Sequence, residues 1–164
     1  MFRYATADDA GPLADLERAA NEVGLAHVFP ADRYPFPFDD VIARWALVLA
    51  DPGVDVLVVE ADEDSGDAGL LAYAAYDSSS LRHVAVRPDQ WGHGLASTAI
   101  EVAVQAMKRR GSTIASLWVL EDNERARRLY QYLGWRATKE RRPAPWPPYP
   151  TEIRYTRLTV QSDR

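Results

Sequence analysis

The stretch that decides the fold runs Val84-Ala-Val-Arg-Pro-Asp-Gln-Trp-Gly-His-Gly-Leu-Ala-Ser97. It predicts an apolar strand, a proline turn with two glycines one residue apart, and then a helix. After Leu95, apolar residues recur with the spacing of one helical face, at Ala99, Val102, Ala103 and Ala106. A glycine-rich turn that opens a helix lets backbone N–H groups approach an anion closely, and the helix N-terminus favours negative charge. The pattern is typical of a phosphate-binding turn, although an ordinary strand–turn–helix corner also uses glycine in this way.

A second informative stretch follows further along the chain. Residues 113–120 have the β-branched and aromatic content of a buried strand. Asp122 and Asn123 come next, and each is a candidate N-terminal cap for a helix. The expected helix carries one apolar face and ends at Gly134 as a C-terminal cap. The residues of that face are Ala126, Leu129, Tyr130 and Leu133.

The two stretches together resemble the GNAT superfamily of acetyl-CoA-dependent N-acetyltransferases. The pyrophosphate motif of that family, Gln/Arg-x-x-Gly-x-Gly/Ala, falls on residues 91–96, with Trp91 in place of the usual Gln or Arg. The second family motif reads Asn-x-x-Ala-x-x-aromatic/Leu-Tyr-x-x-x-Gly-aromatic. It is matched by Asn123, Ala126, Leu129, Tyr130, Gly134 and Trp135. Two motifs in the right order are a stronger signal than either alone, and the resemblance covers residues 54–140.

The resemblance implies an α/β (α+β) fold with a mixed, mostly antiparallel central sheet of about seven strands and helices on both faces. We expect a single N-acetyltransferase domain over residues 1–164. A first helix, capped by Asp8 or Asp9, should turn Leu13, Leu16, Ala20 and Val23 inward. A second helix after Asp39 should bury Val41, Trp45 and Val48. The expected strands are 3–6, 54–61, 69–77, 81–86, 113–120, 135–140 and 153–160.

Composition narrows the function classes. A chain of 164 residues with 47% hydrophobic and 26% charged residues is ordinary for one globular domain. No apolar run reaches the ~20 residues that span a bilayer, and Met1-Phe-Arg-Tyr lacks a signal peptide's apolar core. There is no cysteine, the three histidines lack metal-ligand spacing, and the net charge of −5 disfavours nucleic-acid binding. We therefore expect a cytoplasmic protein without metal, membrane or nucleic-acid partner, and a homodimer is left open.

The resemblance also implies how acetyl-CoA would be held. In the family, the strand before the glycine turn splays from the next strand, so that the main chains of Val84 and Val86 would bind the pantetheine arm. Backbone amides over residues 92–97 would hold the pyrophosphate. The expected cofactor-binding residues are Val84, Val86, Trp91, Gly92, His93, Gly94, Leu95, Ala96, Ser97, Asn123, Ala126 and Tyr130.

Acyl transfer to an amine needs a proton donor for the leaving thiolate and a neutral amine. Tyr130 matches the family's usual general acid, and a phenol with a pKa near ~10 can donate to a thiolate whose conjugate acid lies near ~8.5. A core tyrosine is the competing interpretation. For the general base, the strand offers Ser80, Arg82 and His83, and strict alternation puts His83 on the opposite face. We take His83 as the catalytic candidate, with Glu121 and Asp122 as alternatives.

The acceptor pocket should come from two segments rich in aromatics and proline. Its candidate residues are Phe29, Tyr34, Phe36, Trp146 and Tyr149. These side chains either line a pocket for an amine with an apolar portion or close the ends of the core. The favoured function is an N-acetyltransferase that joins acetyl-CoA and a primary amine, of a small molecule or a peptide N-terminus, by direct attack in a ternary complex. The alternatives are a catalytically idle CoA-binding or sensing module and a transferase of another acyl-CoA.

Overall fold

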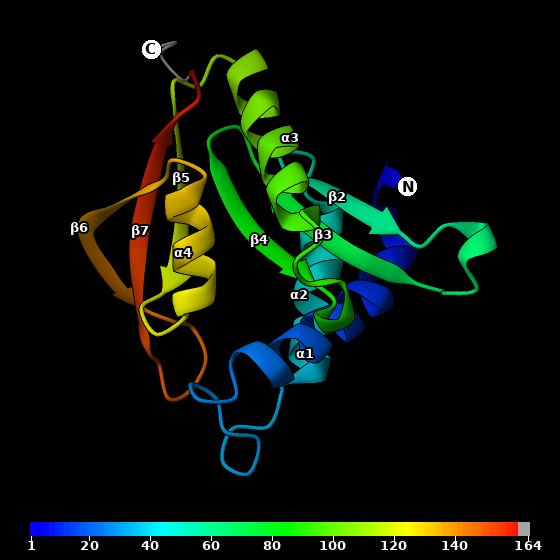
Figure 1. The fold of residues 1–164 in the computed structure, drawn as a ribbon. Coiled ribbons are helices and arrows are strands. Elements are labelled where there is room, and N and C mark those ends of the chain that lie inside the picture. The colour runs from blue at the N-terminus through cyan, green and yellow to red at the C-terminus, as the bar shows by residue number, and fades with distance from the viewer. Residues whose placement is uncertain (161–164) are drawn as a thin grey trace.

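The computed structural model describes residues 1–160, and its strands form one seven-stranded sheet in the order β1-β2-β3-β4-β5-β7-β6 (Figure 1). Every neighbouring pair is antiparallel except β4 and β5, which are parallel. The strands are β1 (Phe2–Tyr4), β2 (Asp55–Glu60), β3 (Leu70–Tyr76), β4 (Ser80–Val86), β5 (Ile114–Leu120), β6 (Arg136–Pro143) and β7 (Thr151–Leu158). The predicted mixed, mostly antiparallel sheet is confirmed. No helix in the described part of the chain is both long and apolar enough to cross a membrane.

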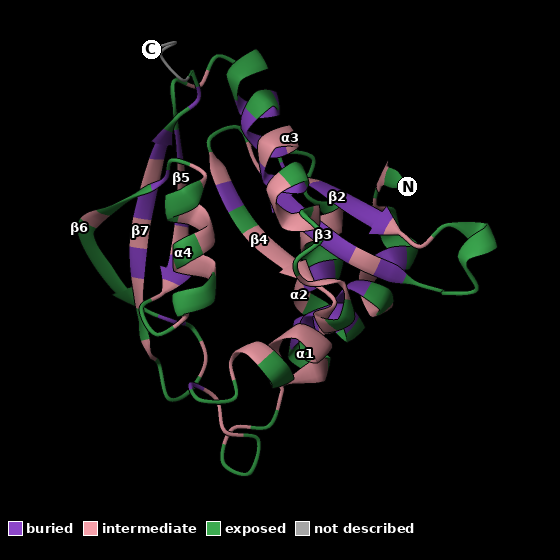
Figure 2. Cartoon of the chain, in the orientation of Figure 1, coloured by how far each residue is buried: buried purple, intermediate pink, exposed green. Residues whose placement is uncertain are grey.

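Helices cover both faces of this sheet, as predicted. The helices are α1 (Ala10–Gly24), α2 (Phe38–Ala50), α3 (Leu95–Arg109) and α4 (Glu124–Tyr132). One core, around Trp135 and Ile100, packs α3 and α4 on one face. The other core, around Trp45 and Leu13, packs α1 and α2 on the opposite face. Figure 2 shows the resulting buried stripes along the strands and on the inner sides of the helices.

The sheet opens in its middle. Strands β4 and β5 pair only at Ser80 with Ser116 and at Leu81 with Leu117. Beyond Leu81 the two strands diverge, and Figure 1 shows β4 turning away from β5. Since β5 is instead paired with β7 along its whole length, the sheet is divided into two halves that meet at one end. The divergence that the resemblance implied is therefore present.

An irregularity in β4 changes which way its side chains point. Tyr76 pairs with Leu81 while Ala75 pairs with His83, so Arg82 is an extra residue in the ladder. Such a bulge breaks the alternation of side chains between the two faces. Leu81 consequently joins the core under α3, whereas His83 contacts Trp45 on the other face. The expectation of strict alternation through Ser80, Arg82 and His83 was wrong at this point.

The end of one strand and the buried face of one helix also differ from the sequence expectation. Strand β6 runs to Pro143, three residues beyond the predicted Glu140, because its pairing with β7 resumes after an irregular stretch. In α1, Val23 is 59% exposed rather than inward. Glu17 is buried in the apolar stripe instead, beside Leu13 and Leu16. Helix propensity alone did not predict a buried charge at Glu17, because the partners of this carboxylate come from other elements.

Candidate active site

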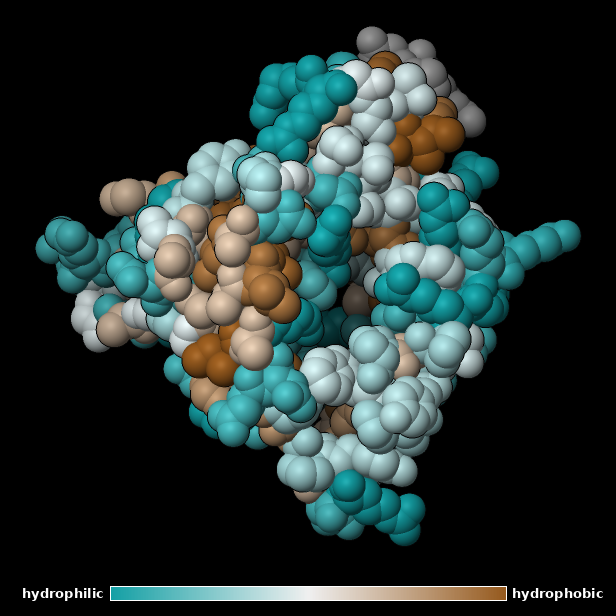
Figure 3. All heavy atoms as spheres, turned by 180° about the vertical axis from the view of Figure 1, so that it is seen from behind, coloured by the Kyte–Doolittle hydropathy of each residue, from teal (hydrophilic) through white to brown (hydrophobic). Residues whose placement is uncertain are grey.

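A large cleft lies where the two halves of the sheet diverge. Its volume is about 1700 Å³, and its walls come from β4, β5, α4 and the two segments that connect α1 to α2 and β6 to β7, with further residues from α1, α2 and β3. From behind, the molecule is hollowed near its centre (Figure 3). The cleft is lined by half of the site residues predicted from the sequence, among them His83, Val84, Asn123 and Tyr130, whereas Val86 and residues 91–97 do not line it.

One edge of β4 presents backbone groups to this opening. The N–H of Arg87 donates to the carbonyl oxygen of Leu71 at 2.8 Å, so this residue faces β3. Antiparallel pairing alternates, and the backbone groups of Val84 and Val86 therefore face the opposite edge, where β5 has already diverged. The indole Nε1 of Trp91 donates to the Val86 carbonyl oxygen at 2.8 Å. The N–H of Val86 and both backbone groups of Val84 are left toward the opening.

The glycine turn has the conformation that an anion seat requires. Gly92 and Gly94 have φ angles of 83° and 77°, in the left-handed region where a side chain is strained. The first N–H bonded within α3 belongs to Thr98, which donates to the Gly94 carbonyl oxygen at 3.0 Å. The N–H groups of residues 95–97 therefore have no carbonyl partner in the helix. A Cβ built on Gly94 meets no protein atom within 4 Å, so the space above the turn is open to a ligand.

Trp91 ties together three elements around this turn. Besides its bond to Val86, its ring lies 3.6 Å from where a Cβ on Gly24 would stand, at the end of α1. The guanidinium of Arg125, near the start of α4, stacks 3.5 Å from the centre of the indole ring. Trp91 therefore fixes the end of β4 against both halves of the molecule, and Arg125 is the cation beside the turn. Exposed His93 follows in the same turn.

Helix α4 and its N-terminal cap carry three residues of the second motif that line the cleft, Asn123, Ala126 and Tyr130. The Asn123 side-chain oxygen accepts from the Ala126 N–H at 3.2 Å, so Asn123, and not Asp122, caps the helix. The phenol ring of Tyr130 packs edge-to-face on Trp135, with ring centres 6.0 Å apart. Burial raises the pKa of Tyr130 above its ordinary value. The hydroxyl group consequently stays protonated at neutral pH, as a proton donor must.

The opposite wall contains the predicted base candidates. Burial, followed by the nearby charges of Arg44 and Arg82, lowers the pKa of His83 to about 3, so that its imidazole is neutral. The Asp77 carboxylate accepts from the Ser80 hydroxyl at 2.7 Å and from Arg82 Nε at 2.8 Å. Burial acts to raise the pKa of Asp77. The hydrogen bonds from Ser80, from Arg82 and from backbone N–H groups outweigh this effect and hold the pKa of Asp77 below its ordinary value.

The alternatives at the end of β5 lie apart from this wall. Glu121 and Asp122 are exposed and are not among the residues that line the cleft. The carbonyl oxygen of Asp122 accepts a hydrogen bond from His27 Nε2 at 2.8 Å, which joins the α1–α2 connection to the turn after β5. Both residues therefore stand in a structural turn rather than beside Tyr130.

Sequence reasoning missed a buried polar cluster in the cleft. Glu17 of α1 is 8% exposed, and its Oε1 accepts from Arg44 Nη2 at 2.6 Å and from the Tyr73 hydroxyl at 3.3 Å. All three side chains line the cleft. One signal in the sequence was available, since Glu17 lies four residues after Leu13 and thus falls inside the apolar stripe of a helix.

The aromatic candidates divide into two groups. Phe29, Tyr34, Phe36 and Trp146 line the cleft. Phe36 and Trp146 also pack against the core under α1 and α2, so the β6–β7 connection reaches across to the other half of the molecule. Tyr149 is 59% exposed and does not line the cleft. The structure brings four of the five predicted residues together and leaves Tyr149 outside.

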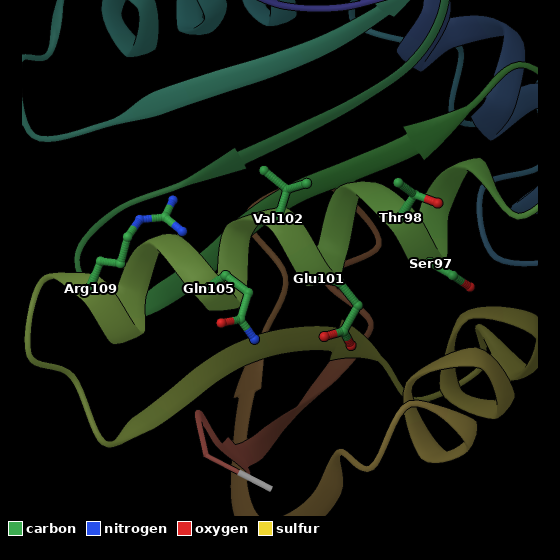
Figure 4. Close-up of a pocket in the computed structure, with 6 residues that line it drawn as sticks. All are labelled: Ser97, Thr98, Glu101, Val102, Gln105 and Arg109. Atoms are coloured by element: carbon green, nitrogen blue, oxygen red, sulfur yellow. The ribbon is translucent and has the colours of Figure 1, made fainter.

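A second, shallower hollow of about 560 Å³ follows the outer surface of α3 (Figure 4). It begins at Ser97, next to the glycine turn, and continues past Glu101 to Arg109. Glu101 forms an ion pair with Arg157 of β7, with Nη1 and Oε1 2.5 Å apart. The side chains that line this hollow come from one face of α3, whereas several elements form the cleft.

Comparison with known proteins gives a consistent result. The model of the acetyltransferase (GNAT) family matches residues 16–135. A GCN5-related N-acetyltransferase from Rhodopseudomonas palustris is 18% identical with a TM-score of 0.79, over 96% of this chain and 94% of that one. The PaiA N-acetyltransferase from Thermoplasma acidophilum, solved with coenzyme A, is 14% identical with a TM-score of 0.70, over 96% and 98%. YncA from Salmonella typhimurium, solved with acetyl-CoA, is 17% identical with a TM-score of 0.64, over 100% and 96%. Among curated protein sequences, none is similar enough to count as a match.

Proposed function

The chain belongs to the acetyltransferase (GNAT) family, and from this premise we propose that it is an acetyl-CoA-dependent N-acetyltransferase. It would transfer the acetyl group to a primary amine, of a small molecule or a peptide N-terminus, by direct attack in a ternary complex. The proposal depends on the combination of an unpaired β4 edge and a partly buried phenol at one cleft, with a glycine turn at the end of the same strand edge.

The chemistry of the open wall fits acetyl-CoA. Pantetheine is a chain of amide groups, which a strand edge can bind as it would bind another strand. This supports roles for Val84 and Val86. The diphosphate is an anion, and it suits the N–H groups at the start of α3. Those groups belong to the run Gly92, His93, Gly94, Leu95, Ala96 and Ser97. Trp91, Asn123 and Ala126 complete the proposed cofactor site by framing its two ends.

Tyr130 is the proposed general acid. When the amine nitrogen attacks the thioester carbonyl, the C–S bond breaks and the sulfur needs a proton. A partly buried, protonated phenol at the cleft supports this role. Positioned acid catalysis typically contributes ~10²–10⁴-fold. His83 stays a predicted catalytic residue. Because its imidazole has a pKa of about 3, we expect it to act as a neutral hydrogen-bonding group toward the amine.

The acceptor is proposed to carry an apolar or aromatic portion. Phe29, Tyr34, Phe36 and Trp146 give the far wall of the cleft a large apolar surface. Burial of apolar area stabilises a complex by ~25 cal/mol per Å². Among solved neighbours, one is a spermidine N-acetyltransferase from Vibrio cholerae and another a ribosomal-protein-S18-alanine N-acetyltransferase from Escherichia coli. Amine acceptors of very different size therefore occur on this fold.

A thiol-release assay with three acceptors tests the proposal. We expect an arylalkylamine and a hydrophobic peptide N-terminus to give free CoA thiol and N-acetyl product with acetyl-CoA, and an aminoglycoside to give less. Acetyl-CoA binding, measured by calorimetry on the same preparation, is the control. Tight binding without thiol release for any amine would identify a CoA-binding module instead. Thiol release with a longer acyl-CoA but not with acetyl-CoA would identify the longer acyl-CoA as the donor.

A further inference from the structure

Glu17 is an ionisable residue placed where a helix normally carries an apolar one. It is 8% exposed, and its neighbours in α1, Leu13 and Leu16, belong to the core. A carboxylate is costly to bury unless it is paired and hydrogen-bonded. Arg44 and Tyr73 supply those partners from α2 and β3. A Leu at this position would have needed neither partner, so the cluster is a feature that the fold alone does not require.

Only one oxygen of Glu17 is used by the protein. The guanidinium of Arg44 and the hydroxyl of Tyr73 both donate to Oε1, at 2.6 and 3.3 Å. Within residues 1–160, Oε2 of Glu17 receives no hydrogen bond. This oxygen is still accessible to solvent. Glu17 lines the cleft. One carboxylate oxygen is therefore fixed while the other is open to whatever occupies the cleft.

Four charged or titratable groups surround this carboxylate. Arg44 stands on α2 and Tyr73 on β3, while His83 lies on β4 close enough for Arg44 to affect its pKa. Burial and then Glu17 raise the pKa of Tyr73 well above its ordinary value, so it keeps its proton and remains a donor. Tyr130 of α4 also acts on the pKa of Tyr73 across the cleft. The carboxylate and the proposed general acid therefore flank the same space.

We propose that Glu17 receives the acceptor amine: its free Oε2 binds the incoming ammonium and takes a proton from it. This inference rests on the proposed function and names the group that the β4 strand does not supply. Arg44 and Tyr73 are positioning residues, because they hold Oε1 and leave Oε2 directed to the substrate. The acceptor class that follows is a protonated primary amine attached to an apolar body.

R–NH₃⁺ gives one proton to the Glu17 carboxylate, and the nitrogen lone pair attacks the thioester carbonyl carbon. The C–S bond breaks, the CoA sulfur leaves with its electron pair, and this thiolate takes the phenolic proton of Tyr130. A second proton from the nitrogen restores the phenol, and Glu17 releases its proton to solvent. The sum is R–NH₃⁺ and acetyl-CoA giving R–NH–acetyl, CoA thiol and one proton.

A series of amines with falling pKa tests this role at pH 7. Wild type, Glu17→Gln and Asp15→Asn are compared. Gln keeps an acceptor for Arg44 and Tyr73, and Asp15 is an exposed acid on the same helix. For an alkylamine of pKa ~10.4, we expect Glu17→Gln to lower kcat/KM by ~10²–10⁴-fold. The loss should shrink for an α-amino group of pKa ~7.7–8 and vanish for an arylamine that is neutral at this pH. Asp15→Asn should match wild type throughout.

A binding measurement separates recognition from folding. CoA affinity should be equal in all three proteins, while the alkylamine should bind CoA-loaded Glu17→Gln more weakly than CoA-loaded wild type. An equal loss for every amine, or no loss, overturns the role of Glu17. If wild type acetylates no amine, the proposed function fails instead. Should Glu17→Gln fail to bind CoA because it is unfolded, Tyr73→Phe must show the same dependence on amine pKa at smaller size, and its absence overturns the proposal.

Discussion

The two walls of the cleft are built in opposite ways. The first wall, β4, offers backbone groups at Val84 and continues into the turn before α3, so that this wall and the turn come from one continuous stretch of chain. The other wall offers side chains, Glu17, Arg44 and Tyr73, that three separate elements bring together. A backbone wall suits a constant ligand such as CoA, whereas a side-chain wall can be altered residue by residue. The proposed donor site would thus be a property of the fold, and the proposed acceptor site a property of this chain.

The largest effect on turnover should come from Tyr130→Phe. The ring keeps its packing on Trp135 and only the hydroxyl is lost, so CoA affinity and stability should not change. Turnover should fall by ~10²–10⁴-fold, since the thiolate loses its proton donor. Steady-state and single-turnover rates check this. Unchanged chemistry in the single-turnover rate would make Tyr130 a core residue.

Acid should destabilise the fold where the two walls meet, through His83 of β4, whose pKa is affected by Arg44. Its pKa is about 3 in the folded protein against 6.5 in the unfolded chain, so the unfolded state binds more protons between these values. The contribution of His83 to stability is therefore fully present above pH 6.5 and is lost as pH falls toward 3, by a few kcal/mol at ~1.36 kcal/mol per unit. Urea unfolding of wild type and His83→Gln at several pH values measures this. Parallel curves for the two proteins would contradict the assignment.

Gly94→Val should damage the backbone wall alone. Valine is strained at the φ angle of 77°, and its side chain would extend into the open space above the turn. We expect CoA affinity to fall about tenfold to a hundredfold, from ~1–3 kcal/mol of backbone strain with added steric hindrance. Gly66→Val is the matched control, with a φ angle of 73° in the β2–β3 connection and open space around it. Equal CoA affinity in both variants would show that the phosphate site lies elsewhere.

The smallest effect concerns the apolar part of the acceptor wall. Trp146→Ala should lower kcat/KM for an arylalkylamine about tenfold, through lost apolar contact, with no change in the KM of acetyl-CoA. Tyr149→Ala removes an exposed ring outside the cleft and should have no effect. If Tyr149→Ala had the larger effect, the acceptor would lie outside the cleft described here.

The contrast between the walls also explains what the sequence could predict. The glycine turn and a cap at Asp122 or Asn123 could be predicted because each depends on residues close together in sequence, and most strands followed from their residue patterns. The architecture of the sheet was implied by the resemblance to the GNAT superfamily. Strict alternation failed at Arg82, since a bulge depends on how β3 pairs with β4. Glu17 was missed because its meaning depends on Arg44 and Tyr73, and only tertiary packing brings them together.

A crystal structure of the CoA complex tests the two-wall account most directly. The account predicts pantetheine along the free edge of Val84 and Val86 and the diphosphate on the N–H groups of residues 92–97. The sulfur should lie beside the Tyr130 hydroxyl, with Glu17 Oε2 across the cleft. A diphosphate bound in the hollow along α3 (Figure 4), or a sulfur remote from both Tyr130 and Glu17, would contradict the account.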